Sequence, residues 1–131
     1  MPARNPTQRT RSTPAVDPTH CNEVRLVGRL AADPTEATLP SGDVVVSWRL
    51  VVDRNPRARR APSGEGARRL VDTLDCAAWT SSVRRRVAAW QAGDVVAVDG
   101  VLRRRFWRGT TGPVSRYEVE AASVKRLTRA G

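Results

Sequence analysis

Arginine is the residue whose abundance gives this sequence its chemistry. All 23 basic residues are Arg except Lys125, and against 13 Asp and Glu they leave a formal net charge of +10. A coding bias in a GC-rich genome accounts for Arg in place of Lys, but it does not account for the excess of positive charge. A small domain this basic indicates a polyanionic partner, and nucleic acid is the commonest one.

The residues that catalysis or a metal site would need stand alone. His20 is the only histidine, and no carboxylate pair or nucleophile motif accompanies it. Cys21 and Cys76 lack the paired spacing of a zinc site and the dense pattern of a disulfide scaffold. We therefore expect no enzymatic activity, no metal and no cofactor, with Cys76 as a small core residue and Cys21 as a free thiol.

The length of 131 residues fits one domain, and 40% hydrophobic residues suffice for one core. The sequence has no apolar stretch of about 18 residues, and its first residues lack the apolar segment of a secretory signal. We expect a cytoplasmic protein. Residues 1–21, rich in Pro, Thr and Arg, are predicted to form a disordered basic arm.

Five short runs typical of β-strands follow, separated by Gly, Pro or Arg-rich segments. They are Glu23–Leu30, Val44–Asp53, Leu70–Trp79, Gly93–Arg105 and Arg116–Val124. In the second run apolar residues that include Trp48 and Leu50 alternate with residues such as Ser47 and Arg49, as in a half-buried strand. A tight turn is predicted just before it, at residues 40–43.

One helix is predicted between the third and fourth strands, over Ser81–Trp90. Val83, Val87 and Trp90 fall on one stripe, Ser81 or Ser82 is placed to cap the start, and Gly93 to end it. Three strands, a helix and two strands are the element order of the OB-fold, a mainly β, five-stranded Greek-key barrel that commonly binds oligonucleotides across its second and third strands. Spacing alone leaves other small barrels open.

Five segments, in the same order and spacing, also resemble the bacterial single-stranded DNA-binding protein family. They are Asn22–Leu30 followed by Asp33-Pro34, Ser41-Gly42 before a long apolar strand, Asp72–Trp79, Gly93–Gly100 with Leu102, Arg103, Arg105 and Trp107, and Arg116-Tyr117 with Glu120. Together they cover about residues 22–127, the predicted OB-fold domain. The resemblance implies sequence-tolerant binding of single-stranded DNA, which coats and protects single strands in replication, recombination or repair.

In this family bases stack on aromatic rings while Arg and Lys hold the phosphates. Trp79 ends the third strand at a stacking position, and Trp107 follows the fourth strand, flanked by Arg105 and Arg108. The candidate phosphate-binding residues are Arg49, Arg54, Arg57, Arg59, Arg60, Arg68, Arg69, Arg103, Arg105 and Arg108. Core packing is the better interpretation of Trp48 and Trp90. Phe106 stays open between the core, packing within the hairpin and a subunit contact, and Tyr117 between structural packing and nucleic-acid contact.

The sequence departs from the family pattern where aromatic residues are often found, at Thr73 and after the second strand. The loop from Arg54 to Arg69 instead carries six Arg and only Glu65 as an acid. We therefore expect binding to depend more on charge than on stacking, with log affinity falling by about 0.7 per phosphate for each unit of log salt. The run Arg84–Arg86 is as well explained by a solvated helix face.

Family members of the housekeeping type continue into a linker and an acidic tail that recruits other proteins, whereas this sequence stops shortly after Leu127. The resemblance thus implies an accessory member with a short end, residues 128–131, and reduced recruitment of repair proteins. By analogy it also implies a homotetramer, with no membrane partner, in the cytoplasm at the nucleoid.

Two other function classes stay open. An RNA-binding or ribosome-associated OB domain would have much the same charge and fold. A protein-interaction module of a replication-restart complex, with weak DNA binding, is favoured by the aromatic residues missing near Thr73 and opposed by Trp79 and Trp107.

Overall fold

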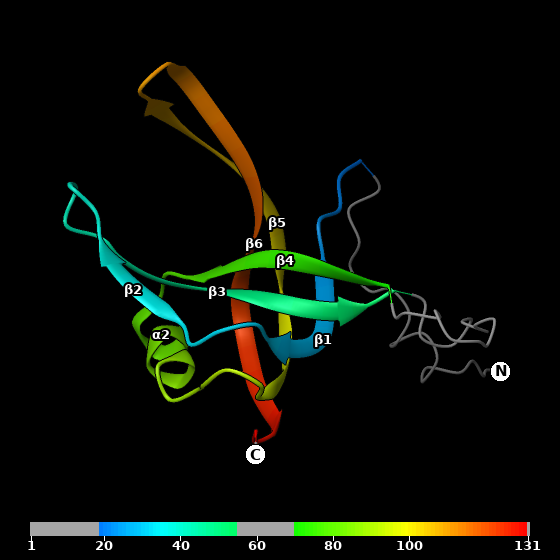
Figure 1. Cartoon of the computed structure of the whole chain (residues 1–131). Coiled ribbons are helices and arrows are strands. Elements are labelled where there is room, and N and C mark those ends of the chain that lie inside the picture. The colour runs from blue at the N-terminus through cyan, green and yellow to red at the C-terminus, as the bar shows by residue number, and fades with distance from the viewer. Residues whose placement is uncertain (1–18, 55–69, 131) are drawn as a thin grey trace, which may run out of the picture.

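The computed structural model describes residues 19–54 and 70–130 of the chain (Figure 1). Its elements are the strands β1 (Val24–Leu30), β2 (Thr35–Thr38), β3 (Val44–Asp53) and β4 (Val71–Ala78), the helix α2 (Ser81–Val87), and the strands β5 (Val95–Gly109) and β6 (Gly112–Thr128). The strands form one sheet in the order β1-β5-β6-β4-β3-β2, and β1 also pairs with β3. This second pairing closes the sheet into a barrel, which confirms the predicted OB-fold with its helix after the third predicted strand.

Strand β2 was absent from the sequence prediction. Its four residues are all exposed, and it pairs with β3 from Thr35 opposite Ser47 to Thr38 opposite Val44. A short strand without a buried face has no alternation of apolar and polar residues, so the sequence offers no signal for it. The sheet therefore has a sixth strand, β2, which forms a hairpin with β3 at its edge.

The core confirms the predicted inward face of β3. Val46, Trp48 and Leu50 are buried, and the ring of Trp48 meets the edge of the Trp90 ring at a centroid distance of 5.5 Å. Cys76 is buried beside them, and burial raises the pKa of its thiol to about 12, so this thiol stays protonated and unreactive at neutral pH. Both tryptophans assigned to the core therefore pack there, as does Cys76, whereas Cys21 is exposed.

The helix begins as predicted but ends earlier. Thr80, rather than Ser81 or Ser82, is the capping residue, and its side chain makes no capping hydrogen bond; its carbonyl accepts from the amide of Arg84. After Val87 the chain tightens, because Trp90 donates to the carbonyl of Val87, three residues back. This tighter turn still brings Trp90 into the core, which is why the stripe predicted a longer helix.

Asp94 is a fully buried carboxylate that ties three segments together. It accepts hydrogen bonds from the amides of Gln91, at 2.9 Å, and Ala130, at 2.7 Å, and Arg126 lies 3.5 Å away. The two backbone amides, with Arg126, hold the pKa of Asp94 below its ordinary value of 3.8 although burial opposes this. The ionised carboxylate thus anchors the end of β6 to the loop before β5.

Replacing Asp94 by Asn is expected to lower the unfolding temperature at pH 7 by several degrees, because the buried amides lose a charged acceptor. The lowered pKa means that the stabilisation is complete above pH 3.8 and is lost as the pH falls below it. Thermal unfolding between pH 7 and pH 2 measures both effects, with the exposed Asp43→Asn as control. An Asp94→Asn protein as stable as the wild type at pH 7 would contradict this anchoring role.

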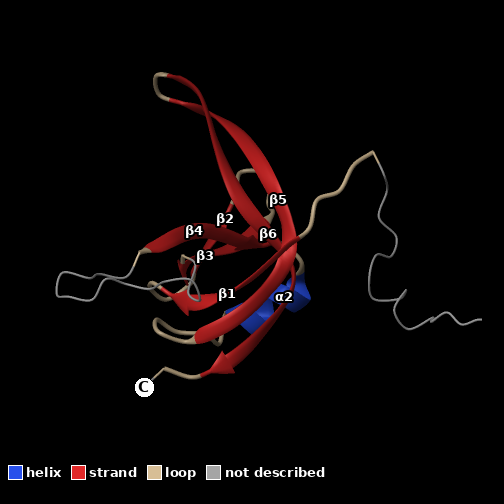
Figure 2. Cartoon of the chain, turned by 90° about the vertical axis from the view of Figure 1, so that its right-hand side faces the viewer, coloured by secondary structure: helices blue, strands red, loops and turns tan. Residues whose placement is uncertain are grey.

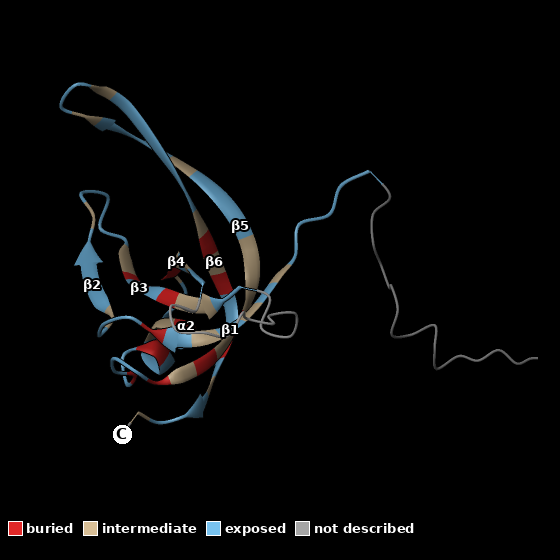
Figure 3. Ribbon diagram, turned by 45° about the vertical axis from the view of Figure 1, so that its right-hand side comes forward, coloured by how far each residue is buried: buried red, intermediate tan, exposed pale blue. Residues whose placement is uncertain are grey.

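The strands β5 and β6 continue well beyond the barrel as a two-stranded arm, which rises from it in Figure 1 and is seen from the side in Figure 2. The sequence prediction ended the strand that corresponds to β5 at Arg105 and began the strand that corresponds to β6 at Arg116. The residues beyond those points are mostly exposed, as the pale blue of the arm in Figure 3 shows, so their burial left no pattern to detect. Within 19–54 and 70–130 no helix has the length and hydrophobicity to span a membrane.

Candidate nucleic-acid interface

The arm presents two faces because side chains alternate along paired strands. Its register runs from Val101 opposite Glu120 to Gly109 opposite Gly112. One face, here called the Trp107 face, carries Arg103, Arg105, Trp107, Val114, Arg116, Glu118 and Glu120. The other, the Phe106 face, carries Leu102, Arg104, Phe106, Arg108, Pro113, Ser115, Tyr117 and Val119.

The two predicted stacking residues lie on one continuous surface. Trp79, half-buried directly after β4, lies under the guanidinium group of Arg105, whose Cζ is 4.6 Å from the ring centroid. Trp107 is 45% exposed and lies under Arg116, with 5.5 Å between Cζ and the ring centroid. Arg105 and Arg116 are directly opposite each other across the arm. The side chains therefore follow one another as Trp79, Arg105, Arg116 and Trp107, which we call the Trp79–Trp107 row.

Carboxylates on neighbouring strands hold the arginines of this row. Nε of Arg105 donates to Glu118 at 2.6 Å, and Nη2 of the same residue lies 3.4 Å from Glu120. Asp75 lies 3.8 Å from Arg116 and 3.5 Å from Arg49 of β3. Like charges directly opposite each other in a sheet repel. Arg105 and Arg116 can face each other because these carboxylates flank them. The row extends through Asp75 onto the surface of β3 and β4.

Other predicted arginines of the described residues are placed less closely to the tryptophans. Arg103 donates to Glu120 at 2.8 Å, and Arg54 donates to Asp72 at 2.7 Å. That hydrogen bond holds the pKa of the Asp72 carboxyl below its usual range and raises the pKa of Arg54. Both arginines are more than half exposed and their carboxylate partners, Asp72 and Glu120, are 46% and 31% exposed, so each pair contributes little to stability and either arginine can exchange its carboxylate for a phosphate.

Arg108 does not flank Trp107 as the sequence suggested. Arg108 directly follows Trp107, and successive side chains of a strand point to opposite faces, so Arg108 lies on the Phe106 face. Arg57, Arg59, Arg60, Arg68 and Arg69 lie outside the described residues, as does nearly all of the predicted arm at residues 1–21. The roles given to these residues stay predictions.

Arg116 is the residue of the row that sequence reasoning missed. The segment Gly109–Gly112 contains the turn signal that could have found it, because a hairpin closed there pairs Arg116 with Arg105. Without that register, Arg116 is one arginine among many in the sequence.

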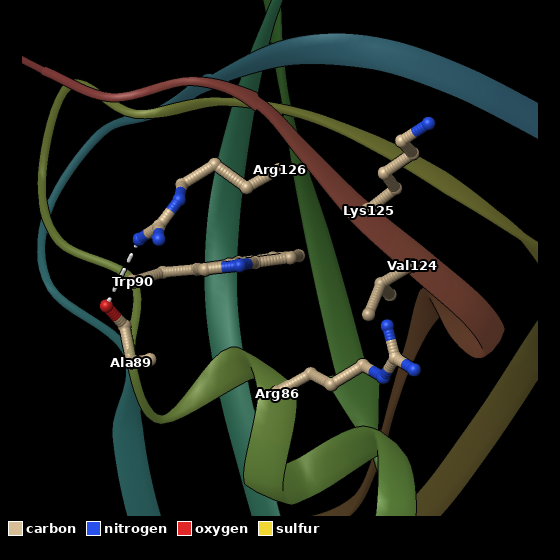
Figure 4. A pocket seen from close by; sticks show the side chains of 6 residues that line it. All are labelled: Arg86, Ala89, Trp90, Val124, Lys125 and Arg126. Atoms are coloured by element: carbon tan, nitrogen blue, oxygen red, sulfur yellow. Dashed lines mark hydrogen bonds between the residues drawn. The ribbon is translucent and has the colours of Figure 1, made fainter.

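A shallow cavity lies away from this surface, between α2 and β6, lined by Arg86, Ala89, Trp90, Val124, Lys125 and Arg126 (Figure 4). Its volume of about 170 Å³ is below that of typical small-molecule sites. Arg126 on its wall donates to the carbonyl of Ala89 at 3.3 Å, the dashed line in Figure 4. The described part of the chain also holds no group of three or more His, Cys, Asp or Glu arranged to bind a metal.

The fold and this surface define an OB-fold protein whose accessible face joins aromatic rings to arginines. A model of the single-strand binding protein family matches residues 21–127, and the chain belongs to this family. The family recognised from the sequence is thereby confirmed.

Relatives agree with this assignment. The chain is 32% identical over 111 residues to the single-stranded DNA-binding protein of Oceanobacillus iheyensis, covering 84% of this chain and 65% of that protein. It is 34% identical over 107 residues to single-stranded DNA-binding protein A of Bacillus subtilis, covering 81% and 59%. The chain thus spans about three fifths of the length of these curated relatives.

A solved structure shows the same fold. The Plasmodium falciparum SSB in complex with ssDNA superposes with a TM-score of 0.62 at 20% sequence identity, over 83% of this chain and 95% of that one. At this identity the likeness supports the barrel architecture.

Proposed function

We propose that this protein binds single-stranded DNA with little sequence preference, and coats and protects single strands in replication, recombination or repair. The observation that carries the proposal is the Trp79–Trp107 row, in which two aromatic rings stand at the ends of a pair of arginines. Relatives named single-stranded DNA-binding proteins, and a related barrel described in complex with ssDNA, support the choice of ligand.

The geometry suggests an exchange of partners on binding. Each ring of the row is covered by a guanidinium group that also reaches a carboxylate. An incoming base can take the place of the guanidinium on the ring, and the displaced guanidinium can bind the adjacent phosphate. Every base has a flat face, so this exchange does not depend on sequence. No step of it is catalytic.

The proposed site includes Trp79, Trp107 and the predicted arginines, among them Arg49, which extends the row over β3. Arg116 joins them as an addition from the structure. By analogy with the family, we infer a homo-oligomer, a tetramer, that acts in the cytoplasm at the nucleoid without a membrane partner.

Tryptophan fluorescence titrated with oligo(dT), oligo(U) and a duplex of matched length tests the proposal. We expect oligo(dT) to quench the fluorescence strongly and the duplex to bind more weakly, because paired bases cannot reach the rings. Log affinity for oligo(dT) should fall with log salt by about 0.7 per phosphate neutralised.

The other function classes give different titrations. Tighter binding of oligo(U) than of oligo(dT) would favour the RNA-binding alternative. Binding to none of the three ligands at low salt would contradict the proposal and favour a protein-interaction module.

A further inference from the structure

The Phe106 face of the arm exposes two aromatic rings that the proposed function does not use. Phe106 is 66% exposed and Tyr117 is 58% exposed, and Leu102 is exposed beside them. The guanidinium carbon of Arg104 lies 4.9 Å from the Phe106 ring centroid and 5.3 Å from that of Tyr117. Large exposed rings gathered on a monomer surface mark a contact site.

The charge on this face differs from that on the Trp107 face. On the Trp107 face, Arg103 and Arg105 form ion pairs with Glu120 and Glu118. On the Phe106 face the register places no acidic residue, and Arg104 hydrogen-bonds only the hydroxyl of Ser115, at 3.3 and 3.2 Å. Its positive charge is therefore left without a carboxylate among the residues that the structure describes, so this face suits an anionic partner.

The charge also argues against a second copy of the chain as the partner. A two-fold contact brings the same face of both copies together, so it would gather the Arg104 and Arg108 side chains of both copies with no acid on either face. Like charges brought together in an interface are unfavourable. A ligand that carries both flat rings and negative charge suits the exposed aromatic rings and the positive charge of this face.

We propose that the Phe106 face is a second contact surface for single-stranded nucleic acid, with bases stacked on Phe106 and Tyr117 and a phosphate bound by Arg104. This inference rests on the proposed function. The arm is then held by single strands on both of its faces, and Arg104 occupies here the place that Arg105 and Arg116 have on the Trp107 face: a guanidinium lying on a ring.

The test is the affinity of the full chain for fluorescein-labelled oligo(dT), measured by anisotropy so that the signal does not come from tryptophan. We expect the Phe106→Ala, Tyr117→Ala double variant to bind at least about 25-fold more weakly, since each lost stack costs about five-fold or more. Leu127→Ala, which removes exposed apolar surface from β6 at the end far from the arm, is the matched control and should bind as the wild type.

A conservative variant gives a direct readout of base contact. Phe106→Trp keeps a ring on this face and should therefore retain the wild-type affinity. Oligo(dT) should also quench the fluorescence of the added tryptophan. Sedimentation velocity of the wild type and the double variant without DNA, with circular dichroism to check folding, separates DNA contact from subunit contact.

Each outcome decides a different point. Weaker binding by the folded double variant at unchanged oligomeric state supports the second surface. Wild-type affinity of that variant overturns the inference and leaves the proposed function intact, and a change in oligomeric state overturns it in favour of a contact between copies. If the wild type itself fails to bind oligo(dT), the proposed function fails and this inference fails with it.

Discussion

Truncating Trp107 to Ala is expected to weaken the binding of oligo(dT) by about 5- to 150-fold, because one stacked base contributes about 1–3 kcal/mol. The ring is 45% exposed at the end of a two-stranded arm, so its removal leaves no cavity in the core. Affinity at fixed low salt, by anisotropy of a labelled oligonucleotide, measures the loss. Trp107→Phe is the control, since it keeps an aromatic platform for Arg116 or a base.

The same substitution at Trp79 tests the other end of the row, with one difference. Trp79 is half-buried and supports the guanidinium of Arg105, so Trp79→Ala removes a stacking ring and also the surface on which Arg105 lies while it is bonded to Glu118. The comparison with Trp79→Phe separates the ring from the packing. Unchanged affinity in folded proteins with either alanine would contradict the role of the row.

The sequence predicted best where burial repeats along one element. Strand β3 has the bounds Val44–Asp53 that were predicted, because Val46, Trp48 and Leu50 face the core while Ser47 and Arg49 face outwards. The apolar stripe of Val83, Val87 and Trp90 likewise located the helix and one wall of the core. These signals are local, so they survive without knowledge of the fold.

The arm could not be predicted in this way. The residues that extend β5 and β6 are exposed on both faces. Successive side chains therefore alternate between two solvent-exposed faces, both with polar and aromatic residues, and not between core and solvent. Which arginine lies on which ring depends on the cross-strand register, as with Arg116 and Trp107 or Arg104 and Tyr117. Register is a non-local property, fixed here by the turn at Gly109–Gly112.

Composition alone does not show which arginines are paired with acids. The sequence shows an excess of arginine, but the structure pairs Arg49, Arg54, Arg103 and Arg105 with carboxylates that come from neighbouring strands. Under the proposed function, each of these arginines exchanges its carboxylate for a phosphate on binding. The proposed salt dependence would therefore report a difference between two sets of ion contacts.

Gly100 is the position in the barrel where a single methyl group should have the largest effect on stability. A Cβ on Gly100 would lie 2.9 Å from the carbonyl carbon of Glu120 and closer still to its oxygen, and both atoms belong to the backbone of the paired strand. Real Cβ atoms essentially never approach within 3.0 Å, so β5 or β6 would have to move. We expect Gly100→Ala to lower the free energy of unfolding by about 3 kcal/mol or more, measured by urea denaturation.

Gly109 on the same strand is the matched control. A Cβ there would meet Cγ2 of Val114, which belongs to an exposed side chain, and would lie 3.1 Å from the carbonyl oxygen of Gly112, a far milder approach to backbone than at Gly100, so Gly109→Ala should cost much less. Equal stability of the two variants would contradict the close approach of β5 and β6 at Gly100.

Gly100 also links stability to the site, because the register of β5 and β6 shifts between Asp99 and Gly100. Such a bulge bends a strand and re-aims the residues beyond it, which here are those of the arm that carries Trp107. A Gly100→Ala protein that still folds, for example with a stabilising osmolyte, is therefore expected to bind oligo(dT) more weakly than the wild type although the residue lies off both faces of the arm. Wild-type affinity in the folded variant would show that the arm takes its direction from elsewhere, with the pairing of β6 with β4 at the base of the arm as the remaining determinant.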